Sequence, residues 1–160
     1  MKKGIYPGSF DPVTYGHMDV VERATSIFEE VHIAIFNNPN KQPYFSLEER
    51  LSLNKEVFKH HQNVVVTAFE GLLVDYAIKH EIYTIIRGLR AVSDFEYELQ
   101  IALMNRRLSC KVDTIFFMSD EKNSFLSSKI VRQVSDFKGN ISTFVPSVVE
   151  AALKKKSNYE

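Results

Sequence analysis

The residues best suited to chemistry begin in the first loop, Tyr6-Pro7-Gly8-Ser9-Phe10-Asp11-Pro12-Val13-Thr14-Tyr15-Gly16-His17. It follows a short apolar run and precedes a segment with apolar residues at helical spacing. Such a strand-to-helix loop binds ligands in α/β proteins, because free N–H groups and the helix dipole attract phosphate. His17 would add a donor there. The loop predicts an anion site, with a simple turn and a packed core histidine as the alternatives.

A second candidate for anion chemistry is Arg87. It ends the apolar run that starts at Thr84 and is followed by Gly88. An arginine at the end of a buried strand is costly unless an anion meets it. Arg87 is therefore predicted to face an anionic group.

The elements that must position these residues alternate between short β-branched or aromatic runs and longer amphipathic stretches. This alternation predicts an α/β fold with a doubly wound five-stranded parallel sheet. A first helix should open near Gly16, and a capping box of Ser46 and Glu49 predicts a helix to about Phe58. Pro146 suits the first turn of a terminal helix that ends in lysines. The predicted strands are Lys3 to Tyr6, Val31 to Phe36, Val64 to Thr67, Thr84 to Arg87 and Thr114 to Met118.

The predicted helix from Val92 to Leu108 carries apolar residues on two sides. One stripe contains Phe95 and Leu99, and the opposite one contains Tyr97 and Ile101. A helix with two apolar stripes must be buried twice, either between layers of its own domain or against another subunit. In so small a domain we expect a subunit contact.

Composition narrows the class of protein. The 160 residues, 44% of them hydrophobic and 25% charged, predict one globular domain over residues 1–160. Lysine plus arginine equals aspartate plus glutamate at 20 each, which argues against a nucleic-acid or membrane-surface partner. One cysteine, Cys110, cannot form an internal disulfide, and the start resembles no signal peptide. No apolar run is long enough to span a bilayer. We expect a cytoplasmic protein.

Three segments resemble known motifs. Thr14-x-Gly16-His17 resembles the (H/T)xGH signature of the nucleotidylyltransferase superfamily, and Ser124 to Arg132 resembles its SFxSS motif. The run from Ile86 to Glu98, with Gln100 and Met104 to Arg106, looks like the diagnostic segment of bacterial phosphopantetheine adenylyltransferases. Two departures are visible: Ser9 stands where many relatives have threonine, and Asn123 where an aromatic residue is common.

The resemblance implies a Rossmann-like nucleotidylyltransferase fold and transfer of the adenylyl group of ATP to 4'-phosphopantetheine, giving dephospho-coenzyme A and pyrophosphate. The nucleophile is already an anion, so the enzyme must mainly align two polyanions and stabilise charge on the α-phosphate. His17, Lys41 and Arg90 are the implied catalytic residues. The implied acceptor-binding residues are Ser9, Lys41, Leu73 and Arg87. The implied ATP-binding residues are Ser9, Phe10, His17, Gly88, Leu89, Arg90, Glu98, Asn123, Ser124, Phe125, Leu126, Ser127, Ser128 and Lys129.

Several of these positions also have ordinary structural explanations. Lys41 could be solvated surface, Glu98 a helix-surface charge, and Leu73 a core leucine. Ser127 and Ser128 are natural helix N-caps, a role compatible with phosphate binding. Asp11 before a proline is commonly a turn former.

The resemblance further implies Mg²⁺ bound with ATP and a homohexamer built as a dimer of trimers. We see no carboxylate cluster that demands a direct protein ligand for the metal. Two other functions remain: adenylation of nicotinamide or nicotinic acid mononucleotide, against which the segment from Arg87 to Glu98 speaks, and a non-catalytic nucleotide-binding module. Neither a P-loop nor a GxGxxG motif occurs.

Overall fold

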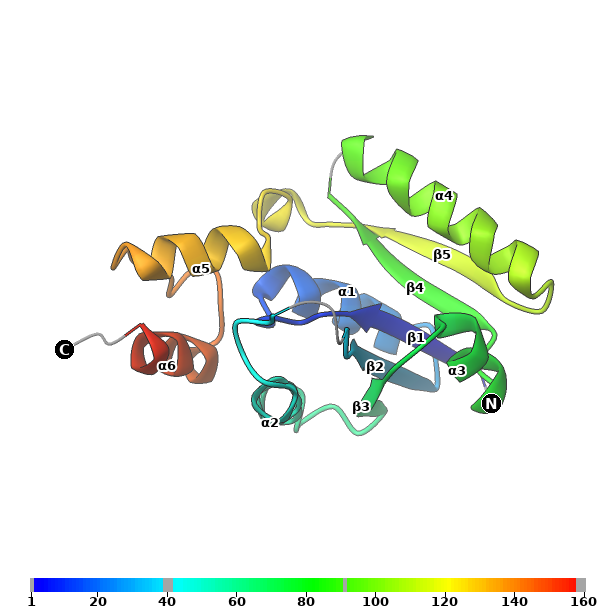
Figure 1. Ribbon diagram of the computed structural model, residues 1–160, viewed down its shortest axis with the longest axis horizontal. Helices are drawn as coiled ribbons and strands as arrows, with labels where there is room; N and C mark the ends of the chain where they lie inside the picture. Colours follow the sequence, from blue (N-terminus) through cyan, green and yellow to red (C-terminus); the bar gives the residue numbers. More distant parts are fainter. Residues whose placement is uncertain (1, 39–41, 91, 158–160) are drawn as a thin grey trace.

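The computed structural model describes residues 2–38, 42–90 and 92–157. Its five strands and the helices between them alternate along the chain, as predicted (Figure 1). The elements are β1 (Lys3–Gly8), α1 (Tyr15–Thr25), β2 (Glu30–Phe36), α2 (Leu47–Val57), β3 (Val64–Phe69), α3 (Leu73–Lys79), β4 (Thr84–Leu89), α4 (Val92–Leu108), β5 (Asp113–Met118), the 3-10 turn η1 (Glu121–Asn123), α5 (Ser128–Asp136) and α6 (Ser147–Lys156).

The sheet is parallel throughout and has the strand order β3-β2-β1-β4-β5. The order reverses between β1 and β4, which pair only at Gly4↔Thr84 and Ile5↔Ile85. Both strands continue beyond these pairs, so they separate toward their carboxyl ends. A crevice at such a switch point is where open α/β sheets bind ligands.

Each face of the sheet has its own core. Val20, Val21 and Ala24 of α1 pack with strand residues and with α2 in one cluster. Val74 and Ala77 of α3 pack in a second cluster on the other face. Figure 1 shows α4 over β4 and β5, and α5 and α6 together at the end of the molecule where β1 ends. The carboxyl ends of β1 and β4 are thus bordered by α1, α4 and α5.

The helix ends follow the predicted local signals closely. Ser46 and Glu49 form the predicted capping box, with 3.2 Å between Glu49 N and Ser46 Oγ and 2.7 Å between Ser46 N and Glu49 Oε2. Pro146 is the N-cap of α6 rather than part of its first turn, because the helix begins at Ser147. Within the described residues, no helix has the length and apolar character needed to cross a membrane.

Helix α4 exposes both of its apolar stripes. Phe95 and Leu99 are 41% and 37% exposed, and Tyr97 is 65% exposed. The less exposed residues of α4 include Asp94, Glu98, Ala102 and Asn105, which recur at helical spacing between the stripes. Within a single chain, therefore, the inward face of α4 is largely polar. The alternative that the helix is buried between layers of its own domain is wrong.

Candidate active site

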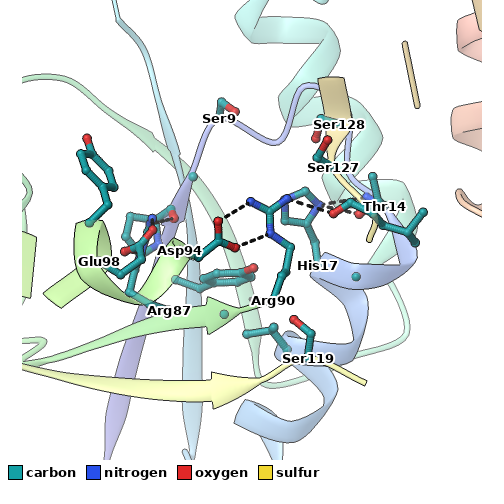
Figure 2. A pocket seen from close by; sticks show the side chains of 18 residues that line it. Ser9, Thr14, His17, Arg87, Arg90, Asp94, Glu98, Ser119, Ser127 and Ser128 are labelled. Atoms are coloured by element: carbon teal, nitrogen blue, oxygen red, sulfur yellow. Dashed lines mark hydrogen bonds and ion pairs between the residues drawn. The ribbon is translucent and has the colours of Figure 1, made fainter. Parts of the chain in front are cut away.

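The crevice between β1 and β4 opens into a cavity of about 540 Å³. This volume lies within the range of small-molecule sites. In Figure 2, Arg87 and Glu98 lie on one side, Thr14, Ser127 and Ser128 on the other, and Arg90 with Asp94 between them. Of the residues predicted to bind ATP, the cavity wall contains Ser9, His17, Gly88, Arg90, Glu98, Leu126, Ser127 and Ser128.

His17 is fixed by the start of α1. The Thr14 N–H donates to His17 Nδ1 at 3.1 Å, and the Thr14 hydroxyl lies 3.0 Å from the same nitrogen. A nitrogen that accepts from a main-chain N–H carries no proton, so the neutral ring has its hydrogen on Nε2. Burial, with further effects of Arg90 and Arg87, lowers the pKa of His17 to about 4. At neutral pH this residue is an uncharged Nε2–H donor.

Two aromatic side chains enclose the histidine. The Phe10 ring lies 4.9 Å from the His17 ring and 5.3 Å from the Tyr6 ring, centroid to centroid. Phe10 is 1% exposed and does not line the cavity, and its φ of 45° is uncommon for a residue other than glycine. Burial raises the pKa of the Tyr6 hydroxyl to about 12. The Phe10 side chain therefore packs behind the site, and only its main chain could serve a ligand.

Arg87 meets its anion inside the protein. Its Nε donates to Glu98 Oε2 at 2.6 Å, its Nη2 contacts Glu98 Oε1, and its Nη1 donates to Pro7 O at 2.9 Å. Burial alone would lower the pKa of Arg87, but the Glu98 carboxylate more than offsets this and the pKa is raised. The prediction that Arg87 faces an anionic group is confirmed, and that group is the Glu98 carboxylate of the same chain. The buried strand end therefore does not by itself require an anionic ligand.

Arg90 is held more loosely. Its Nε donates to Asp94 Oδ2 in the first turn of α4, at 2.9 Å, and its Nη1 donates to Leu126 O at 3.0 Å. The side chains of Arg90 and Asp94 are 41% and 29% exposed, compared with 28% and 12% for Arg87 and Glu98. Arg90 therefore remains accessible to an anion in the cavity.

A second, more apolar cavity of about 310 Å³ adjoins the first. Leu73, predicted to contact the acceptor, lines it together with side chains from α4 and Phe36 and Phe69 at the strand ends. Both cavities share the walls formed by Pro7, Gly8, Ser9, Arg87, Tyr97 and Glu98. A ligand with an anionic end and a long, weakly polar arm could occupy both.

The two serines at the end of the SFxSS segment have different partners: one caps α5 and the other binds the first loop. The Ser127 hydroxyl accepts from Ile130 N at 3.2 Å and caps α5, as predicted. Ser128 does not cap this helix, because it is the first helical residue and its hydroxyl donates to Pro12 O at 2.7 Å. The segment therefore ties α5 to the loop that precedes His17.

Some predicted ATP-binding residues lie apart from the cavity wall. Asn123 and Phe125 line a separate cleft beside Met18 and Phe144. Leu89 is buried, Lys129 is exposed, and the Ser124 hydroxyl donates to Glu121 O. Lys41 lies outside the described residues. The structure brings together the first loop, β4, Glu98 and Leu126 to Ser128, but not the outer part of the predicted ATP site.

The cavity also contains residues that the sequence reasoning missed. Thr14, Asp94, Tyr97 and Ser119 line it. The sequence gives little signal for Asp94, because Arg90 precedes α4 and the rule that pairs opposite charges four residues apart on a helix does not apply to it. Thr14 was noted only as part of a motif, and its hydrogen bond to His17 sets the tautomer.

The described residues contain no group of three or more histidine, cysteine, aspartate or glutamate side chains that could hold a metal ion. The two carboxylates on the cavity wall, Asp94 and Glu98, are each paired with an arginine. Mg²⁺ brought in by a nucleotide would therefore rely on phosphate oxygens and water, which is how this ion is commonly bound.

Solved structures share this fold across the whole chain. A Vibrio parahaemolyticus structure, described as a nicotinate-nucleotide adenylyltransferase, superposes with a TM-score of 0.71 at 21% identity and covers 100% of this chain and 97% of its own. A Plasmodium falciparum nicotinic acid mononucleotide adenylyltransferase complexed with NaAD gives 0.68 at 16% identity, covering 98% and 96%. The chain therefore has the nucleotidylyltransferase fold.

Comparison of the amino-acid sequence with known proteins identifies the family to which the chain belongs. A cytidylyltransferase-like family model matches residues 5–134. A phosphopantetheine adenylyltransferase from Alkaliphilus metalliredigens (strain QYMF) is 52% identical over 157 residues, which are 98% of this chain and 100% of the relative. The chain belongs to the cytidylyltransferase-like family and, within it, to the phosphopantetheine adenylyltransferases.

Proposed function

We propose that the two adjoining cavities hold ATP and 4'-phosphopantetheine while the chain transfers the adenylyl group between them. The observation that carries this proposal is that a polar and an apolar cavity meet at Ser9 and Arg87, beside the Nε2–H of His17. An oxygen of the acceptor phosphate attacks the α-phosphorus of ATP. The bond from that phosphorus to the bridging oxygen of the β-phosphate breaks, and pyrophosphate leaves with dephospho-coenzyme A as the other product.

His17 acts in this proposal as a hydrogen-bond donor to the α-phosphate. No base is needed, because the attacking phosphate is already an anion. A neutral donor held by Thr14 requires no proton transfer and little reorganisation as charge develops on the α-phosphate. Arg90 would add a positive charge from the same wall of the cavity, and Lys41 is proposed to bind the acceptor phosphate as a flexible cation.

The acceptor is proposed to span both cavities. Its phosphate would lie near Ser9 and Arg87, and its pantetheine arm would extend along Leu73 in the apolar cavity. ATP would occupy the polar cavity with its ribose near Glu98 and its phosphates between His17 and the start of α5. Arg87 and Glu98, which are paired with each other, would then face one ligand each. The remaining ATP contacts proposed from the family, at Phe10, Leu89, Asn123 to Phe125 and Lys129, would involve main-chain atoms or the outer edge of the nucleotide.

Mg²⁺ is proposed to accompany ATP, where it would neutralise phosphate charge. The exposed apolar residues of α4 support the proposed homohexamer, because a surface of this kind normally meets another protein surface. We also propose a cytoplasmic location, in keeping with an enzyme of small, charged metabolites.

The test is to mix the purified protein with ATP and Mg²⁺ and to measure pyrophosphate release with phosphopantetheine or with nicotinamide or nicotinic acid mononucleotide. Release with phosphopantetheine alone is the expected result. Release only with a mononucleotide would show that the acceptor is that mononucleotide and not phosphopantetheine. No pyrophosphate release with any of the three acceptors, despite ATP binding, would indicate a non-catalytic nucleotide-binding module.

A further inference from the structure

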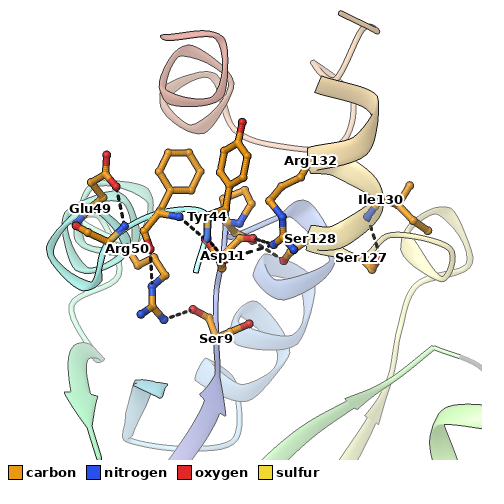
Figure 3. Close-up of polar contacts among 12 residues, drawn as sticks. Ser9, Asp11, Tyr44, Glu49, Arg50, Ser127, Ser128, Ile130 and Arg132 are labelled. Carbon is orange, nitrogen blue, oxygen red and sulfur yellow. Dashed lines mark hydrogen bonds and ion pairs between the residues drawn. The ribbon is translucent and has the colours of Figure 1, made fainter. Parts of the chain in front are cut away.

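A buried polar network lies behind the cavities and connects the first loop to the segment between β2 and α2 (Figure 3). Asp11 and Arg50 are its central members, with only 6% and 2% exposure. Buried charges persist in proteins when they are hydrogen-bonded, so their partners indicate what they hold in place.

Asp11 binds the main chain just before α2. Its Oδ2 accepts from Tyr44 N and its Oδ1 from Phe45 N, both at 2.8 Å. Both carboxylate oxygens thus receive a main-chain N–H from a segment more than thirty residues further along the chain. Arg132 of α5 contacts Asp11 Oδ2 at 3.4 Å and also donates to Asp11 O. Asp11 is therefore more than a turn former, because it joins three separate segments.

Arg50 in α2 is the second member of this network. Asp11, Arg50 and the main-chain groups that they bind are called the frame below. Its Nε donates to Phe45 O at 3.2 Å, and its Nη1 donates to Ser9 O at 2.9 Å and to Phe36 O at 3.1 Å. All the hydrogen bonds that its guanidinium donates within the described residues go to main-chain carbonyls. Phe36 ends β2 and Phe45 precedes α2, so one guanidinium fixes both ends of the segment 37–44. In sequence, this segment contains Lys41.

The bond to Ser9 also orients a peptide of the first loop. In a planar trans peptide the C=O and the following N–H point in opposite directions. Because Arg50 holds Ser9 O, the Phe10 N–H points away from Arg50. Within the described part of the chain, that N–H donates to no acceptor. Arg50 thus fixes the direction of a free donor next to Ser9, which lines both cavities.

We propose that Asp11 and Arg50 are positioning residues for adenylyl transfer, which hold Ser9 and both ends of the segment 37–44 in the arrangement that aligns the acceptor phosphate with ATP. This inference rests on the proposed function. Neither side chain lines a cavity, so both act through the main chain that they bind. The alternative is that they stabilise the fold without affecting alignment.

Two conservative variants separate these roles. Arg50→Lys keeps the charge but lacks the planar fork that reaches three carbonyls. Asp11→Asn keeps the shape, but its NH₂ group would face a main-chain N–H. The matched control is Asn54→Ala, because Asn54 is fully buried one turn after Arg50 in α2 and its side chain, among the described residues, donates only to Arg50 O, at 2.8 Å. The control removes a buried hydrogen bond of α2 and leaves the frame intact.

The experiment measures pyrophosphate release while phosphopantetheine and ATP are varied separately, together with the ATP dissociation constant and the folded fraction at the assay temperature. Arg50→Lys and Asp11→Asn should lower kcat/KM for phosphopantetheine on the order of 100-fold, since misplacement by about 1 Å can have this effect. Their ATP dissociation constants should rise by a clearly smaller factor, because only Ser9 and Phe10 among the proposed ATP contacts are held by Arg50, whereas His17, Arg90 and Glu98 are not. Asn54→Ala should lose stability but keep kcat and both KM values.

The positioning proposal fails if Arg50→Lys and Asp11→Asn, corrected for their folded fractions, keep the kinetics of Asn54→Ala. Should one of the two variants not fold, the other decides the question, because they disturb the frame from different segments. Failure of the proposed function would look different: the unaltered protein itself would release no pyrophosphate with phosphopantetheine.

Discussion

The first loop with the start of α1 and the helix α4 border the same cavity but are built in opposite ways. The loop region is packed behind its ligand-facing side, with Phe10 against His17 and with Asp11 and Arg50 binding main-chain groups. Helix α4 turns the polar side chains of Asp94 and Glu98 toward the cavity and leaves its apolar stripes exposed. One wall is packed against its own chain, whereas the other carries apolar side chains that its own chain leaves exposed.

This difference indicates how the work is divided. In the proposed mechanism, the groups that must be placed accurately against the reacting phosphorus lie on the packed wall, where surrounding contacts limit their movement. Helix α4 contributes carboxylates that neutralise and orient two arginines of β4 and its following turn. Changes on the packed wall should therefore affect turnover most, and changes on the outer side of α4 should affect assembly.

The largest effect is expected from His17 on the packed wall. His17→Ala should lower kcat on the order of 100- to 1,000-fold, as removal of one donor to a developing oxyanion does. ATP binding should weaken far less, because the contact strengthens in the transition state. His17→Asn is the matched variant, since its side-chain oxygen can still accept from Thr14 N but cannot replace Nε2–H. Equal losses in kcat and ATP affinity, measured by steady-state kinetics and calorimetry, would contradict the donor role.

The ion pair between Arg87 of β4 and Glu98 of α4 should give the next largest effect. Arg87→Ala should raise KM for phosphopantetheine and lower kcat/KM about 10- to 100-fold, the value of a hydrogen-bonded charge. Part of that loss would come from leaving Glu98 unpaired at 12% exposure. The double variant Arg87→Ala with Glu98→Gln removes this part, so a double-mutant cycle separates acceptor binding from the buried charge. An unchanged KM for the acceptor in Arg87→Ala would place the acceptor phosphate elsewhere.

The lowered pKa of His17 predicts that the packed wall loses stability at low pH. The unfolded histidine has a pKa of 6.5 and the folded one about 4, so the unfolded chain binds more protons between these values. The contribution of His17 to the free energy of unfolding is therefore complete above about pH 6.5 and decreases as the pH falls toward about 4. The difference in unfolding free energy between the protein and His17→Asn, measured by denaturant titration at several pH values, should follow this course. A difference independent of pH would show that the ring is not held neutral.

A substitution at Gly88 tests how closely β4 packs against Val20 of α1. A Cβ at this position would lie 2.9 Å from Cγ2 of Val20, which is 1% exposed. Gly88→Ala should therefore reduce the free energy of unfolding by about 1–3 kcal/mol, as overpacking does. Adding Val20→Ala should recover part of the loss. Gly16→Ala is the control, because its added Cβ would find its nearest atom at 3.5 Å; a similar loss there would rule out the proposed clash.

The sequence predicts the fold and much of the cavity wall because both depend on local patterns. Strand and helix periodicity, the capping box at Ser46, and the short motifs around His17, Arg87 and Ser127 are all readable within a few residues. Hydrogen bonds between a side chain and a distant main chain are not. The acceptors of Arg50 are carbonyls up to 41 residues away, and no residue type marks a carbonyl as a partner. The pairing of Arg87 with Glu98 is not predicted, because the sequence alone suggests only an ATP contact or a helix-surface charge for Glu98.

The smallest effect on a single chain is expected on the outer side of α4. Leu103 and Leu108 are 58% and 53% exposed, so Leu103→Lys with Leu108→Lys should change the stability of one chain by no more than about 0.5 kcal/mol. The same change should reduce the molar mass measured by light scattering, because it places charges in the proposed subunit contact. The matched control is Ile130→Lys on α5, an apolar residue of similar exposure (44%) away from α4. If the molar mass of the α4 variant equals that of the control, the outer side of α4 does not form the subunit contact, and another surface must hold any oligomer together.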